Sequence, residues 1–210
     1  MALRPRSVEP GGRPVTAPTS AAGQPCGGLG RAVARAFRSG KPQILALGPL
    51  CGESVVYLAG RGAKVHVDEV EFPDPTPARQ PGEPAPAITR VAIDLPNDLC
   101  DLVLAWEVFD FVPPDRLPEF GAEIVRVMRV GGQIFLFAHQ KPPSENAVVP
   151  RYRVLADDLI AREEPAEAPR RRYVHANRDI ERALSGLSVQ GIQLQRNQLR
   201  EILASKVGVG

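Results

Sequence analysis

Three apolar runs in this sequence end in residues whose types suit ligand binding. One run, QILAL, leads into a loop in which Gly48 and Gly52 stand four residues apart. Glycine has no Cβ, so the backbone there can approach a ligand closely. Two later runs end in acids, at Asp68 and Glu69 and again at Asp94. Many nucleotide-binding α/β domains begin with a strand that enters such a glycine-containing loop.

A second group of candidate residues follows two more apolar runs. Trp106, Glu107 and Asp110 come after the run LVLA, His139 closes the run QIFLFAH, and Tyr152 lies in the segment beyond it. Carboxylate, imidazole and phenol groups can orient or deprotonate an acceptor, so we take these last four as substrate candidates. Trp106 has an alternative place in the core, because a lone tryptophan is usually well buried.

The elements that must position these residues alternate along the chain. Apolar periodicity predicts helices over 28–40, 53–62, 115–132 and 177–186. The last of these helices would be N-capped by Asn177. Strands are predicted over 43–48, 63–71, 88–95 and 133–140, and a further strand begins at about residue 101. The final segment, 188–206, fits an antiparallel strand pair or a strand and a short helix. Such alternation predicts an α/β fold with a doubly wound, Rossmann-like, mostly parallel sheet that ends in antiparallel strands.

The chain is long enough for one domain with a tail. Residues 1–26 are rich in Pro, Gly, Ser and Thr, and we predict a disordered tail there. We predict a single domain over 27–210. Within it, 141–175 contains a β-hairpin or an irregular insertion.

Composition excludes several classes of function. The net charge is +2, from 26 basic and 24 acidic residues, which argues against a nucleic-acid or membrane partner. Three cysteines without CxxC spacing indicate neither a disulfide framework nor a zinc site, and three scattered histidines indicate no metal cluster. With no apolar run near the ~20 residues of a membrane span, and no apolar stretch at the N-terminus typical of a secretory signal, we expect a cytoplasmic protein.

The order and spacing of four motifs resemble the class I S-adenosylmethionine-dependent methyltransferases. ILALGPLCG resembles the family's first strand and glycine loop, and HVDEV resembles its acid-ended second strand. IDLPNDLCDLVLAWEVFDFVPP resembles the third-strand acid and the fourth strand with its following turn. RVMRVGGQIFLF resembles the turn before the fifth strand, with Val130 in place of proline. The resemblance covers residues 28–139 and extends more loosely to the C-terminal strand pair.

The resemblance implies a cofactor, S-adenosyl-L-methionine, and a place for each of its parts. The residues implied in cofactor binding are Gly48, Pro49, Leu50, Gly52, Asp68, Glu69, Asp94, Leu95 and Trp106. Glu69, or Asp68 one residue earlier, would accept the ribose hydroxyls. Asp94 would accept the adenine amino group while Leu95 packs on the ring. The implied function is methyl transfer to a small molecule or protein, and the segment 141–175 would lie on the substrate side.

Alternative interpretations remain at several of these positions. The glycines could serve only a tight turn, the acids after the second strand could be solvated charges, and Asp94 could cap a turn before Pro96. Ala46 and Leu50 stand where the family has an acid and a glycine. The alternative function is therefore a methyltransferase-like domain without catalysis that acts as a binding or structural partner. A nicotinamide-dependent oxidoreductase is disfavoured, because the loop lacks the third glycine of G-x-G-x-x-G.

Overall fold

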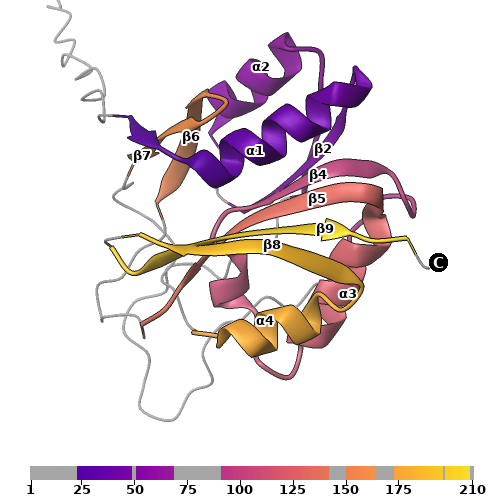
Figure 1. The fold of residues 1–210 in the computed structure, drawn as a ribbon, viewed down its shortest axis with the longest axis vertical. Helices are drawn as coiled ribbons and strands as arrows, with labels where there is room; N and C mark the ends of the chain where they lie inside the picture. Colours follow the sequence, from indigo (N-terminus) through magenta and orange to yellow (C-terminus); the bar gives the residue numbers. More distant parts are fainter. Residues whose placement is uncertain are drawn as a thin grey trace, which may run out of the picture.

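A six-stranded sheet forms the centre of the protein, in the order β3-β2-β4-β5-β9-β8 (Figure 1). The computed structural model describes residues 23–48, 51–68, 91–141, 150–163, 173–195 and 197–208. The strands are β2 (Gln43–Leu47), β3 (Lys64–Asp68), β4 (Cys100–Ala105), β5 (Met128–His139), β8 (Leu187–Leu194) and β9 (Leu199–Lys206). The pairs β2–β3, β2–β4 and β4–β5 are parallel, whereas β9 is antiparallel to both β5 and β8. The predicted fold class is confirmed, and the end of the chain is the strand pair.

Helices cover both faces of this sheet (Figure 1). On one face lie α1 (Gly27–Ala36), with its 3-10 extension η1 (Phe37–Ser39), and α2 (Gly52–Gly60); on the other lie α3 (Leu117–Val127) and α4 (Asn177–Ala183). Successive strand residues point to opposite faces. Ile44 accordingly packs into the apolar cluster beneath α1, and Leu45 packs into the cluster beneath α3. Two-sided burial explains why the central strands are continuous apolar runs.

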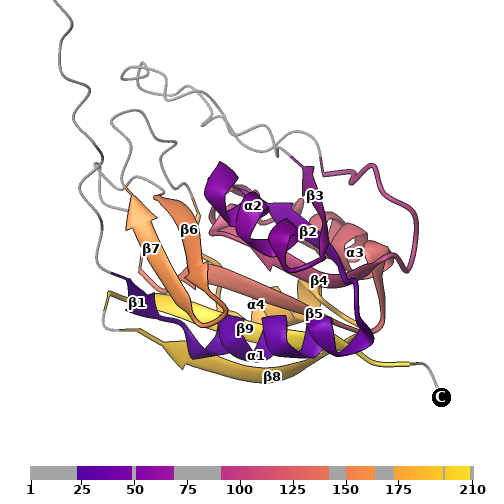
Figure 2. The ribbon, with the colours of Figure 1, turned by 90° about the horizontal axis from the view of Figure 1, so that it is seen from above.

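A second, three-stranded sheet lies beside α2 (Figure 2). It contains β1 (Gln24–Pro25), β6 (Arg151–Ala156) and β7 (Leu159–Glu163), in the order β1-β7-β6 and antiparallel throughout. The β6–β7 hairpin is one of the two forms that the sequence left open for this segment. Because β1 pairs with β7, the folded part of the chain includes residues 24 and 25, which the sequence placed in the tail. Residues 1–22 lie outside the described residues.

Three predicted details are wrong. The helix expected over 115–132 ends at Val127, and residues 128–132 belong to β5. The described part of the expected third strand, 91–95, is not a strand, and its backbone bonds instead to side chains of α3. The residue at the N-cap of α4 is Ala176 rather than Asn177. Asn177 is the first helical residue, and its side-chain oxygen accepts a hydrogen bond from Arg200.

Among the residues that the structure describes, no helix is long and apolar enough to cross a membrane.

Candidate functional site

The glycine loop joins β2 to α2 at the carboxyl edge of the sheet. Gly48 has φ +100°, and a Cβ built on it would lie 2.7 Å from the carbonyl oxygen of Trp106. Glycine is therefore required here by its left-handed backbone and by the close approach of the β4 end. At Gly52, a Cβ would meet nothing within 4 Å. Pro49 and Leu50 lie outside the described residues.

A pocket of about 310 Å³ lies at the ends of β2 and β3. Its lining residues are Leu45, His66, Val67, Asp68, Asp94 and Leu95. Three of them, Asp68, Asp94 and Leu95, are residues that the sequence singled out, and the structure brings them around one cavity. Glu69, the other acid proposed for this place, lies outside the described residues.

Three of the lining residues, Leu45, His66 and Asp68, lie on the α3 face of the sheet. His66 pairs in register with Leu45 and Asp68 pairs with Leu47, and both leucines belong to the apolar cluster beneath α3. His66 was not among the predicted site residues, although the two-residue spacing from Asp68 places both side chains on one face of a strand. Burial and the nearby Lys64 lower the pKa of His66 below its ordinary value of 6.5. It is therefore a neutral group at neutral pH, hydrogen-bonded to Gln43 at 2.8 Å.

The segment that carries Asp94 is held by the side chains of α3. Arg126 donates hydrogen bonds to the carbonyl oxygens of Ile93 and Leu95, at 2.7 and 2.8 Å. Glu123 accepts a hydrogen bond of 3.1 Å from the amide of Ile93 and two from Arg126. These bonds satisfy backbone groups on both sides of Asp94, which a neighbouring strand would otherwise satisfy. Neither residue gave a signal in the sequence, because their role depends on contacts about 30 residues apart.

Trp106 lies in the core, away from the pocket. Its side chain is fully buried and stacks on Tyr152, with ring centroids 5.0 Å apart and an interplanar angle of 17°. Phe135 and Phe137 contact the same indole. These partners belong to the apolar cluster on the α1 face. The position therefore matches the core interpretation of Trp106, which the sequence had left open.

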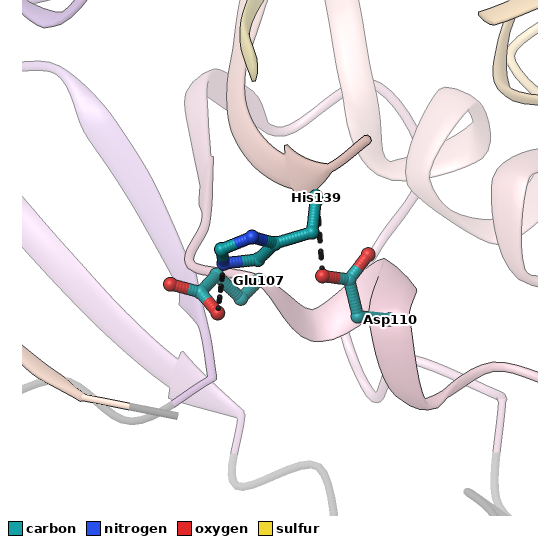
Figure 3. A group of neighbouring side chains, drawn as sticks. All are labelled: Glu107, Asp110 and His139. Atoms are coloured by element: carbon teal, nitrogen blue, oxygen red, sulfur yellow. Dashed lines mark hydrogen bonds and ion pairs between the residues drawn. The ribbon is translucent and has the colours of Figure 1, made fainter. Parts of the chain in front are cut away.

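The four substrate candidates from the sequence meet in one buried cluster at the ends of β4 and β5. Figure 3 shows three of them, Glu107, Asp110 and His139. Glu107 accepts a hydrogen bond from the Tyr152 hydroxyl, and its Oε2 lies 3.2 Å from Nε2 of His139. The backbone amide of His139 donates to Oδ2 of Asp110 at 3.1 Å. Glu107 and Asp110 are fully buried, and His139 is 7% exposed. The sequence thus identified the members of this cluster but not their contacts.

The backbone at Glu107 is unusual. Glu107 has φ 53° and ψ 11°, in the left-handed region, and it precedes the 3-10 helix η2 (Val108–Phe111). A non-glycine residue there costs about 1–3 kcal/mol, and such strain gathers at functional sites. Glu107, at this strained position, lies between Tyr152 and His139.

Charge around the cluster is compensated from β9. Arg200 is nearly buried and donates to the carbonyl oxygens of Ala138, His139 and His175. Burial lowers the pKa of Arg200 below its ordinary value, and the negative charge of Asp110 offsets only part of this shift. Burial and the charge of Glu107 hold the pKa of Tyr152 well above 10. Tyr152 is therefore a protonated donor toward the Glu107 carboxylate at neutral pH.

The β6–β7 hairpin brings Tyr152 to this cluster by packing on α2. Ser54 Oγ donates to the Tyr152 carbonyl at 3.2 Å and accepts from the Val154 amide at 2.9 Å. At the hairpin turn, Asp157 pairs with Arg61 and accepts a 2.8 Å hydrogen bond from Tyr57. The hairpin therefore packs along α2, from Ser54 near its start to Arg61 just after its end.

Comparison with known proteins gives structural neighbours only. No family model matches the sequence, and no curated protein is similar to it in sequence. The structure is similar to that of the 1,6-didemethyltoxoflavin-N1-methyltransferase of Burkholderia thailandensis, solved with bound 1,6-didemethyltoxoflavin and S-adenosylhomocysteine. The two have a TM-score of 0.50 and 16% identity over 86% of this chain and 79% of that one. It is also similar to the cyclase SpnF, with a TM-score of 0.50 and 10% identity over 86% of this chain and 81% of that one.

Both likenesses are at low sequence identity, so they concern the fold and not the activity. The chain therefore has the fold of the class I S-adenosylmethionine-dependent methyltransferases.

Proposed function

We propose that the protein transfers a methyl group from S-adenosyl-L-methionine to an acceptor held at the ends of β4 and β5. The observation that carries this proposal is the pocket in which Asp68, Asp94 and Leu95 meet. In a doubly wound sheet, ligands bind outside the carboxyl ends of the strands. A cavity of about 310 Å³ is at the small end of ligand pockets, and its size suits the adenosine part of the cofactor.

The pocket's polar groups suit a nucleoside. Asp68 ends β3, where its carboxylate can accept hydrogen bonds from two ribose hydroxyls. Asp94 is exposed at the rim, where it can accept from the adenine amino group beside the apolar side chain of Leu95. The methionine part would then extend along the sheet edge, over Gly48 and the start of α2.

The reaction needs little chemistry from the protein. The acceptor's lone pair forms the new bond to the methyl carbon, the electron pair of the old bond goes to sulfur, and S-adenosylhomocysteine leaves. Alignment of the two reactants supplies much of the rate. A base is required only where the acceptor must lose a proton. In this proposal, His139 or Glu107 takes that proton, since both lie in the buried cluster where β4 and β5 end.

Isothermal titration calorimetry with S-adenosylmethionine and S-adenosylhomocysteine tests the cofactor. We expect both to bind, and Asp68→Asn and Asp94→Asn to weaken binding by about 10- to 150-fold each. That range corresponds to about 1.5–3 kcal/mol for a hydrogen bond to a charged group. Asp115→Asn is the matched control, because Asp115 is an exposed acid outside the pocket. Absence of binding by either compound at millimolar concentration would contradict the proposal.

Turnover separates this function from the alternative of a non-catalytic binding domain. Radiolabelled methyl transfer to an acceptor library, with small molecules and proteins in separate arms, supports the enzyme. Tight cofactor binding with no transfer in either arm would favour the non-catalytic domain. The solved cyclase shows that this fold is also found in a protein named for another reaction.

A further inference from the structure

We propose that Glu107, Asp110 and His139 form a binding site for one divalent transition-metal ion. One donor atom from each residue lies within 4.8 Å of the donor atoms of the other two. Figure 3 shows the Glu107 carboxylate facing the imidazole of His139, with Asp110 on the other side of the histidine. The three residues come from two segments that meet where parallel strands end, and ligands bind at that edge.

The separation of two donors already suits a shared ion. Zinc lies about 2.1 Å from imidazole nitrogen and from carboxylate oxygen, so two such ligands at angles of about 90–110° are roughly 3.0–3.4 Å apart. Oε2 of Glu107 and Nε2 of His139 are 3.2 Å apart. An ion can therefore lie between these two atoms with little movement of either side chain. Asp110 reaches the same ion by a small shift or through one water.

Charge in the cluster favours a cation. Two carboxylates, Glu107 and Asp110, are fully buried, and a buried charge is costly unless it is compensated. Arg200 supplies one positive charge near Asp110. A metal ion bound by His139 and Glu107 would place further positive charge beside these carboxylates.

A neighbouring residue completes the site. The Tyr152 hydroxyl donates to Oε1 of Glu107, which fixes the carboxylate and leaves Oε2 directed toward His139. Hydrogen bonds of this kind orient metal ligands, and losing one typically weakens metal affinity by about 10- to 100-fold. Mixed imidazole and carboxylate donors suit zinc, manganese or iron better than magnesium, which prefers oxygen ligands and water.

The test uses the full chain and metal ions alone. After dialysis against a chelator, the protein is titrated with Zn²⁺, Mn²⁺ or Mg²⁺ by calorimetry, and the retained metal is counted by mass spectrometry after desalting. We expect one Zn²⁺ or Mn²⁺ per chain and much weaker Mg²⁺ binding. Glu107→Gln and His139→Gln should each weaken binding by about 100-fold or more, and Tyr152→Phe by about 10- to 100-fold.

Matched controls come from outside the cluster. His66→Gln and Glu119→Gln remove a histidine and an acid at positions with greater solvent access, and both variants should keep the wild-type metal affinity. Circular dichroism of each metal-free variant shows whether it is folded. Should the buried variants fail to fold, NMR of the wild type decides. Mn²⁺ should broaden the imidazole signals of His139 at one equivalent while those of His66 stay sharp.

The proposal is overturned by three results. These are less than stoichiometric metal retention, equal retention by the cluster variants and the controls, and broadening of His66 before His139. The measurements require no S-adenosylmethionine and no methyl acceptor. The metal site can therefore fail while cofactor binding and methyl transfer stand. If the metal does bind, His139 and Glu107 are its ligands, and another group takes the acceptor's proton.

Discussion

A hydrogen bond of 2.8 Å joins the guanidinium of Arg126 to the carbonyl oxygen of Leu95, and it ties helix α3 to the rim of the pocket. A second bond, to the carbonyl of Ile93, holds the residue on the other side of Asp94. Glu123 bonds both to Arg126 and to the Ile93 amide. Arg126 is therefore a positioning residue for Asp94, and it acts without touching the cavity.

Arg126→Gln should lower both stability and affinity for the adenosine part of the cofactor. Loss of a charged donor from two backbone carbonyls costs about 1.5–3 kcal/mol of unfolding free energy. We expect S-adenosylhomocysteine to bind about tenfold more weakly, corresponding to about 1.4 kcal/mol. Urea denaturation measures the first effect, and calorimetry at a temperature where the variant is folded measures the second.

Arg116→Gln is the matched control for this change. Arg116 stands at the start of the same helix and also pairs with a glutamate three residues along, Glu119. That pair is exposed, and exposed ion pairs are worth about 0–1 kcal/mol. The control should leave affinity unchanged. Equal losses in affinity for both variants would contradict a specific role for Arg126.

The hydrogen bonds from Arg126 and Glu123 to the segment 91–95 show why part of the fold could be predicted from the sequence and part could not. Strands β2, β4 and β5 contain the apolar runs ILAL, LVLA and IFLFA, because both faces of these segments are covered. A short sequence window carries that signal. The segment 91–95 has a strand-like apolar pattern as well. Its backbone partners, however, are the side chains of Arg126 and Glu123. A local pattern gives no information on partners from a distant helix.

A similar limit applies to the site. Acids at strand ends are visible in the sequence, and the sheet edge brings Asp68 and Asp94 together. The contact of Tyr152 with Glu107 depends on how the β6–β7 hairpin packs on α2. Trp106 and Glu107 are neighbours in sequence, yet one packs in the core and the other joins the polar cluster. The turn of the backbone at Glu107 separates them, and sequence periodicity does not reveal it.

The two loop glycines should respond differently to alanine. Gly48→Ala places a Cβ 2.7 Å from the Trp106 carbonyl in a left-handed backbone. The backbone conformation alone costs about 1–2 kcal/mol, and the contact adds to it. Gly52→Ala has open space around it and should be neutral or stabilise by up to about 1 kcal/mol. Thermal and urea denaturation compare the two.

Gly52→Ala also reports on the cofactor loop. If the methionine part of the cofactor passes over this residue, the added methyl group should weaken S-adenosylmethionine binding while stability is kept. Adenosine, which in this proposal occupies the pocket lined by Asp68 and Asp94, should bind the Gly52→Ala variant as well as it binds the wild type. Unchanged affinity for the whole cofactor would mean that Gly52 serves only the turn.

Ser54→Ala should loosen the hairpin. The Ser54 hydroxyl is buried and bridges the Tyr152 carbonyl and the Val154 amide. Removing this hydroxyl leaves the Val154 amide without its acceptor, which lowers the free energy of unfolding by about 1–3 kcal/mol. Hydrogen exchange should then show faster exchange of the Val154 amide. Ser188→Ala, at an exposed position of β8, should change stability by less than about 0.5 kcal/mol.

Stability should fall on acidification because of His175. This side chain is buried, and its Nε2 lies 3.1 Å from the carbonyl oxygen of Phe109 and 3.0 Å from that of Val112. Burial lowers the pKa of His175 below its ordinary value of 6.5. Between pH 6.5 and the lower pKa of the folded state, the imidazole of His175 is protonated in the unfolded chain but neutral in the folded chain. The stability present above pH 6.5 is therefore lost as the pH falls toward the folded pKa.

Urea denaturation at several pH values between 5 and 8 measures this loss. His175→Gln keeps a side-chain N–H that can donate to the same carbonyls, but it does not titrate, so its stability should depend less on pH over this range. The pKa of His66 is shifted in the same direction. That residue is more exposed, and His66→Gln should flatten the profile less. A profile for His175→Gln as steep as that of the wild type would assign the acid sensitivity to other groups.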